Sequence, residues 1–121
     1  QMQDYDSAVE ISRALTEALD ATNTVVIASS DMTHYESAKS AAAKDHSALN
    51  RVTALDAKGF FGVVEAENIS ACGYAPITSL ITYAVGVCAK AELLSYHNSG
   101  DITGDHSSVV GYAAVSFKKQ A

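Results

Sequence analysis

An aspartate, a histidine and a cysteine are the residues of this chain whose types and spacing could do chemistry. Asp31 and His34 lie three positions apart in a polar segment, 29–35, that directly follows an apolar run. At this spacing, in a tight loop or a first helical turn, both side chains can face one point. A carboxylate and an imidazole are ligand types that non-haem Fe(II) takes, and Zn(II) accepts them too. On the residues alone, Asp31 could equally cap a following helix, with His34 exposed in its first turn.

Cys72 is the second chemical candidate. It precedes Gly73 in a loop, just before a helix whose first turn would hold Pro76, the only proline of the chain. The N-terminus of a helix favours the thiolate, which is the nucleophilic and metal-binding form of cysteine. The alternative is a small buried residue in a tight loop. Cys88, by contrast, lies within an apolar helical stripe and is predicted to belong to the core.

The remaining histidines are predicted to have surface roles. His46 falls in the middle of a helical stretch beside Lys44 and Asp45, which indicates a solvated face. His97 and His106 flank Gly- and Asp-rich turns, and neither has ligand spacing to another histidine. Those turns could bind an anion through backbone N–H groups, or they could be plain turns.

The elements that must position these residues begin with a helix and a strand. A capping box at Ser7 opens the helix, and its apolar residues recur on one face: Ile11, Leu15 and Leu19. The run 24–28 is β-branched and does not alternate, which is typical of a strand buried on both faces in a parallel sheet covered by helices. Ligands of such sheets bind in the crevice outside the carboxyl ends of the strands, where the segment 29–34 would lie.

The rest of the chain predicts three further helices and two strands. A helix spans about 36–55, Asp56 caps a shorter one, and another begins near Pro76 after the loop 68–75. Strands are predicted over 92–96 and 108–117. The order α-β-α-α-α-β-β predicts an α/β fold with few strands for a self-sufficient sheet, which indicates a missing partner segment.

Composition narrows the class of protein. The 121 residues are enough for one domain or fragment, over 1–121. The chain is not expected to be disordered, because 48% of its residues are hydrophobic and only 18% are charged. A formal net charge of −6 argues against a nucleic-acid partner. No apolar run is long enough to cross a membrane, and no signal-peptide pattern is present, so a cytoplasmic location is expected. Because the chain begins with Gln1 rather than Met, we expect it to be processed, cut or expressed from an internal start.

Four ordered motifs give the chain a family resemblance. The segment 28–35 resembles the Ser-Ser-Asp-hydrophobic-Ser/Thr-His-Tyr signature of Memo-family proteins, also called component B of the AmmeMemoRadiSam system. The segment 55–60 resembles the family's Leu-Asp-Pro-x-Gly-Phe stretch, with Ala57 in place of the proline. The segment 70–77 is similar to its Cys-Gly-x-x-Pro-Ile loop. The C-terminal block is matched by 96–101, 104–105 and 110–113.

This resemblance implies a fold, a site and a partner. The fold would be a sheet flanked by helices, similar to the class III extradiol dioxygenases, with this chain as the C-terminal half. The family pocket gathers two N-terminal histidines with an aspartate, a histidine and a cysteine, which match Asp31, His34 and Cys72 here. The two N-terminal histidines have no counterpart in this chain. We therefore expect the missing N-terminal half or a homo-oligomer as partner.

The implied functions fall into different classes. As an enzyme, the protein would be a non-haem-iron, dioxygenase-like oxidoreductase, with His34 as ligand or general base, Asp31 as ligand or orienter and Cys72 as a thiolate ligand. A thiolate favours copper or zinc over the two-histidine, one-carboxylate iron site, so the metal is left open among Fe, Zn and Cu. The alternatives are a peptide-binding scaffold, a copper-binding module or an accessory to a radical-SAM partner. The ligand would be a small molecule or a peptide.

Overall fold

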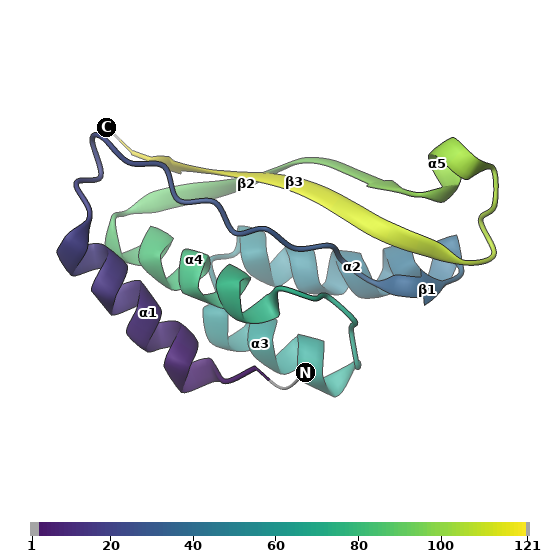
Figure 1. Ribbon diagram of the computed structural model, residues 1–121, viewed down its shortest axis with the longest axis horizontal. Coiled ribbons are helices and arrows are strands. Elements are labelled where there is room, and N and C mark those ends of the chain that lie inside the picture. The colour runs from purple at the N-terminus through teal and green to yellow at the C-terminus, as the bar shows by residue number, and fades with distance from the viewer. Residues whose placement is uncertain (1–2, 121) are drawn as a thin grey trace.

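The computed structural model describes residues 3–120, which form helices and a small sheet (Figure 1). Capping side chains set where several helices begin: Ser37 accepts a hydrogen bond from the Ser40 backbone N–H, and Asp56 accepts one from that of Gly59, as predicted for Asp56. The elements in chain order are α1 (Tyr5–Ala18), β1 (His34–Glu36), α2 (Ala38–Thr53), α3 (Ala57–Ala66), α4 (Tyr74–Gly86), β2 (Ala89–Asn98), α5 (Gly100–Thr103) and β3 (Val109–Lys119).

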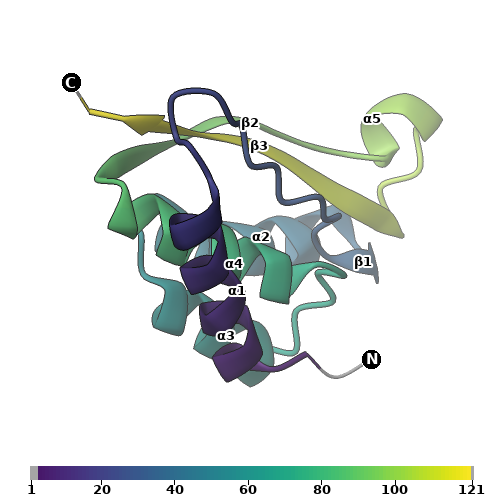
Figure 2. The same ribbon diagram turned by 60° about the vertical axis from the view of Figure 1, so that its left-hand side comes forward.

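The sheet is antiparallel and has the order β1-β3-β2. β2 and β3 pair along their length, from Ala89 opposite Lys119 to Asn98 opposite Gly111, whereas β1 pairs with only the first residues of β3. The helices α1 to α4 lie on one face of this sheet (Figures 1 and 2). The α/β class and a helix-covered sheet are confirmed, and the prediction of parallel strands is wrong.

The run 24–28, predicted as a strand, follows an extended path beside β3 (Figure 1), but no strand of the described chain pairs with it. Burial alternates along the run: Val26 and Ala28 are half-buried, while Val25 and Ile27 are 84% and 82% exposed. The expectation of burial on both faces is therefore wrong. Backbone hydrogen bonds between this segment and β3 begin only at Met32. The Met32 N–H donates to the Gly111 carbonyl. A strand requires a neighbour at hydrogen-bonding distance, and residues 3–120 do not provide one here.

The first helix begins earlier than predicted, and the face that it turns inward is shifted from the predicted one, with Leu15 and Leu19 half-buried. Asp4, not Ser7, is its N-cap, and the Asp4 carboxylate accepts a hydrogen bond from the Ser7 N–H. Ala8 and Ser12 are its buried residues, whereas Ile11 of the predicted apolar face is 54% exposed. Small residues let α1 approach α4 closely, and the Ser79 hydroxyl donates to the Ala8 carbonyl across that contact.

The core lies between the sheet and α2, α3 and α4. Its buried residues include Leu49 and Val52 of α2, Phe60 and Val64 of α3, and Ile81 of α4. Cys88, predicted to be core, is exposed instead. α4 ends at Gly86, and Cys88 takes a positive φ of 58° in the turn to β2, which directs its side chain away from the stripe. No helix among residues 3–120 is long and apolar enough to span a membrane.

Candidate metal centre

The structure brings Asp31, His34 and Cys72 together. One ligand atom from each residue lies within 4.8 Å of the others, and His34 Nε2 is 3.6 Å from Asp31 Oδ2. Asp31 and His34 flank the entry into β1, and Cys72 lies in the loop that leads into α4. The side chain of His34 is 22% exposed and that of Asp31 49% exposed, so the group faces solvent from a partly covered position.

Two hydrogen bonds to Ser70 fix His34. The His34 backbone N–H donates to Ser70 Oγ at 2.7 Å, and His34 Nδ1 lies 2.8 Å from the Ser70 carbonyl oxygen. Since a carbonyl oxygen only accepts, this contact places a proton on Nδ1. The lone pair of the neutral ring is then on Nε2, the atom that faces Asp31. This is the arrangement in which metal-binding histidines are held in proteins.

Ser30 joins the two loops that carry the candidate ligands. Its hydroxyl donates to the Asp31 carbonyl at 2.6 Å and accepts from the Gly73 N–H at 2.8 Å. The Asp31 N–H in turn donates to Cys72 Sγ at 3.3 Å. A Cβ at Gly73 would lie 2.7 Å from the Ser29 carbonyl oxygen, so only glycine permits this close approach. Cys72 itself is exposed, which excludes the alternative of a small buried residue.

The donor set fits a transition-metal ion. Oxygen, nitrogen and sulfur ligands arranged tetrahedrally at Zn²⁺ bond lengths lie about 3.3–3.8 Å apart. The separation of 3.6 Å between Asp31 Oδ2 and His34 Nε2 falls in this range, and all three ligand atoms lie within 4.8 Å of one another. The competing interpretation of Asp31 as a helix cap is wrong, because β1 follows it and the N-cap of α2 is Ser37.

The remaining histidines, which were predicted to lie on the surface, are not members of this group. His46 is exposed, and its Nδ1 contacts the Ala42 carbonyl oxygen. His97 and His106 lie on either side of Asp101, at 3.5 and 3.6 Å from its carboxylate. The backbone N–H of Asn98, followed by the two histidines, holds the pKa of Asp101 below its usual range. The surface prediction for these histidines is confirmed.

Asp45 is the residue that the sequence interpretation misplaced. The sequence places it with His46 on a solvated face, yet it is fully buried. Its carboxylate accepts hydrogen bonds from the backbone and hydroxyl of Thr33 and from the Tyr96 hydroxyl. A signal was present: Asp45 has helical spacing to the buried stripe of α2, whose other members are Ala41, Ala48, Leu49 and Val52.

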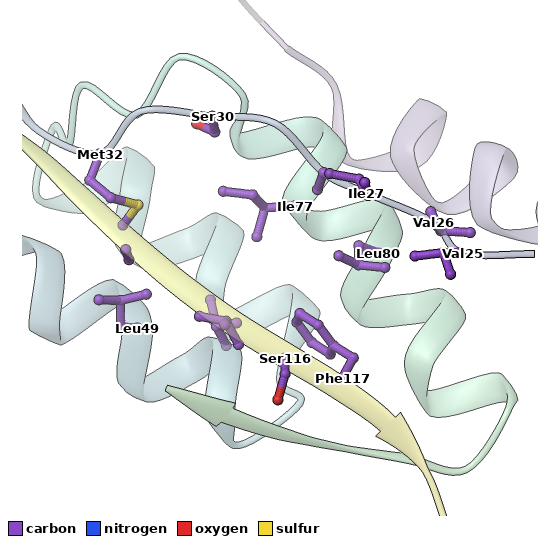
Figure 3. A pocket seen from close by; sticks show the side chains of 14 residues that line it. Val25, Val26, Ile27, Ser30, Met32, Leu49, Ile77, Leu80, Ser116 and Phe117 are labelled. Carbon is purple, nitrogen blue, oxygen red and sulfur yellow. The ribbon is translucent and has the colours of Figure 1, made fainter. Parts of the chain in front are cut away.

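An apolar cavity of about 350 Å³ opens beside the centre (Figure 3). Ser30 and Met32 line it next to the candidate ligands, and Figure 3 shows Leu49, Ile77 and Leu80 forming its helical side. The run 25–28 and the second half of β3 form the other walls. The cavity thus separates the extended run from the edge of β3.

Comparison with known proteins identifies similar chains. A family model described as "Memo-like protein" matches residues 1–116. A MEMO1 family protein of Methanopyrus kandleri is 45% identical over 98% of this chain and 43% of its own length. Those of Methanosarcina acetivorans and Methanothermobacter thermautotrophicus are each 40% identical, over 94% and 95% of this chain and 44% and 43% of their own lengths. The chain therefore spans less than half the length of these relatives.

Proposed function

Since this chain belongs to the Memo-like protein family, we propose that Asp31, His34 and Cys72 bind one transition-metal ion. The observation that carries the proposal is the convergence of a carboxylate oxygen, an imidazole nitrogen and a thiol sulfur within 4.8 Å. The proton on His34 Nδ1 supports it, because Nε2 is then free to bind a metal.

The sulfur ligand bears on the choice of metal. Thiolate favours copper or zinc, whereas two histidines and a carboxylate are the set that non-haem Fe(II) oxygenases use. The proposal therefore includes Fe, Zn and Cu, with copper or zinc favoured for these three residues. When bound, such an ion supplies Lewis-acid or redox chemistry to a group placed beside it.

The chain's own residues would prepare a substrate for that chemistry. Asp31 and His34 both lie at the entry to β1, and either could accept a proton if the metal leaves it free. The cavity beside them is apolar, and its volume is at the lower end of small-molecule sites. Its apolar walls would exclude water from a bound molecule. These features support a small apolar or aromatic substrate, and the family resemblance makes a dioxygenase-like reaction the candidate chemistry.

Metal binding is tested by titrating the reduced chain anaerobically with Fe(II), Zn(II) and Cu(I), each in a separate sample. We expect one equivalent of one of these ions to bind. Cys72→Ala and His34→Ala should weaken binding at least about tenfold. Cys88→Ala and His46→Ala are matched controls, because both replace exposed residues of the same types elsewhere. A wild-type chain without stoichiometric metal, or equal loss in the controls, would contradict the proposal.

Turnover is tested separately from binding. The loaded protein is incubated with catechol-like compounds while O₂ consumption is followed. Substrate-dependent uptake that disappears in His34→Ala would support an oxidoreductase. Affinity for the compound without O₂ uptake would instead support a binding module.

We also propose a partner for the apolar cavity and the exposed run 24–28. This run has strand-like alternation and no paired neighbour within residues 3–120, and Val25 and Ile27 are exposed. Because the relatives are more than twice as long, the proposed occupant is the part of a Memo-like protein that this chain does not span. That part would supply a neighbouring strand and further metal ligands.

Co-expression with the complementary portion of the Methanopyrus kandleri relative tests this partner. A one-to-one complex by light scattering, with slowed amide exchange over 24–28, is expected. If the chain forms a homodimer that the added portion does not dissociate, the occupant would be a second copy of this chain. A chain that remains a stable monomer both alone and with the added portion would refute the proposal.

A further inference from the structure

A carboxylate without solvent contact lies directly behind the candidate metal centre. Asp45 on α2 is 0% exposed. Its Oδ1 accepts from the Thr33 backbone N–H at 3.0 Å and from Thr33 Oγ1 at 2.6 Å, and its Oδ2 accepts from the Tyr96 hydroxyl at 2.5 Å. Thr33 is itself fully buried and lies between Asp31 and His34 in the chain.

This burial needs an explanation, because a carboxylate loses its hydration when it leaves water. No ion pair within residues 3–120 reaches Asp45. Its three hydrogen bonds come from Thr33 and Tyr96 instead. Burial, together with the bond to Asp45, raises the pKa of Tyr96 above its usual value, so its hydroxyl remains a donor. An apolar residue at this position of the α2 stripe would fill the same space without the free-energy cost of removing a charge from water.

Thr33 is held from two directions. Its side chain and N–H bind Asp45, while its carbonyl accepts a hydrogen bond from the Gly111 N–H of β3. The Met32 N–H donates to the Gly111 carbonyl at 2.9 Å, so one residue of β3 brackets Met32 and Thr33. A Cβ on Gly111 would lie 2.1 Å from Asp45 Oδ2, which shows how closely the strand lies against the carboxylate. The backbone between the two candidate ligands therefore has a defined place relative to α2 and β3.

We infer that Asp45 is a positioning residue of the metal centre: through Thr33 it sets the place of Asp31 and His34, and so their distance from Cys72. The inference rests on the proposed metal binding. Asp45 is not itself a ligand, since its oxygens already accept three hydrogen bonds and it has no exposed surface. Groups that orient metal ligands in this way change affinity and ligand field when they are replaced.

The test uses the full chain loaded with Co(II), whose visible spectrum reports ligand geometry. Thr33→Val removes one bond to Asp45 with little change of shape, Asp45→Asn removes the charge, and Tyr96→Phe removes the third bond. We expect about tenfold weaker Co(II) binding and a shifted visible band for Thr33→Val and Asp45→Asn, and a smaller effect for Tyr96→Phe. Ile81→Val, a change in the buried core on α4, is the control for lost stability and should retain the wild-type spectrum.

The outcomes separate this inference from the proposed function. If the wild-type chain binds no Co(II), both fail. If the wild type binds and the Thr33 and Asp45 variants match its affinity and spectrum, only the positioning role is overturned. Spectral change that follows melting temperature and includes Ile81→Val would show a general structural role and also overturn it. If Asp45→Asn does not fold, Thr33→Val decides the result.

Discussion

Replacing Gly111 by alanine should destabilise the fold strongly, because there is no room for a Cβ at this position of β3. That Cβ would lie 2.1 Å from Asp45 Oδ2 and 2.8 Å from the Tyr96 hydroxyl. Neither atom can move freely, since Asp45 is fixed by three hydrogen bonds. Overpacking costs about 1–3 kcal/mol. Loss of one hydrogen bond to the charged carboxylate adds about 1.5–3 kcal/mol. Alanine leaves the unfolded chain fewer conformations than glycine does, and this offsets about 0.4–1 kcal/mol of the loss.

The net loss is therefore about 2–5 kcal/mol, a large share of a domain stability of about 5–15 kcal/mol. Urea unfolding followed by far-ultraviolet circular dichroism measures it. Gly62→Ala is the matched control: Gly62 lies inside α3, and a Cβ there meets nothing within 4 Å. This control should become more stable by about 0.5–1 kcal/mol. A Gly111→Ala chain within about 0.5 kcal/mol of wild type, or equal losses in both variants, would refute this account of the buried network.

Three further predictions concern charges and caps. Hydrogen bonds from Ser40, and then from Lys44, lower the pKa of Glu36 in the folded state. The stabilising contribution of Glu36 is therefore present above pH 4.5, the pKa of the unfolded residue, and is lost as the pH falls below that value. Urea midpoints of wild type and Glu36→Gln should thus differ at neutral pH and converge in acid, and a gap independent of pH would contradict this. Asp56→Ala removes the cap of α3 and should cost about 1 kcal/mol, measured as a lower melting temperature, with Asp6→Ala as an exposed control. Because the pKa of Tyr96 is raised in the folded state, stability should fall as pH rises past 10.0, its ordinary value, and ultraviolet titration of Tyr96→Phe should lack the last-ionising phenol.

The helices were predictable because their signals are local. The Asp56 cap and the Pro76 turn both act within a few residues, and α3 and α4 begin close to where these signals place them. Cys88 shows the limit of this reasoning. Its apolar spacing continues the stripe of α4, but the helix ends at Gly86 and the backbone at Cys88 turns with a φ of 58°. Periodicity does not report the residue at which a helix stops.

The strand prediction for 24–28 failed for a different reason. The run 24–28 has the composition of a buried strand, and its backbone is extended with alternating burial. Its pairing and the covering of Val25 and Ile27 depend on a neighbour that residues 3–120 do not contain. β2 and β3 were found, but they are longer than predicted, because their mutual pairing continues past the apolar residues to Ala89 and Lys119. Strand structure is set by contacts between distant residues, and these are only weakly encoded in any one segment.

The residues of the candidate site also differ in how far the sequence alone could identify them. Asp31, His34 and Cys72 could be selected from residue type and loop position, because ligands must come from groups that bind metals. Asp45 could not be interpreted in this way, since its partners Thr33 and Tyr96 are 12 and 51 residues distant. Its place on the apolar stripe of α2 was nevertheless a usable signal. A charge on a buried helical face must find donors elsewhere in the fold or be solvated at the expense of packing. Where such a charge lies in the helix that follows a ligand-bearing loop, that loop is the first place to look for its donors.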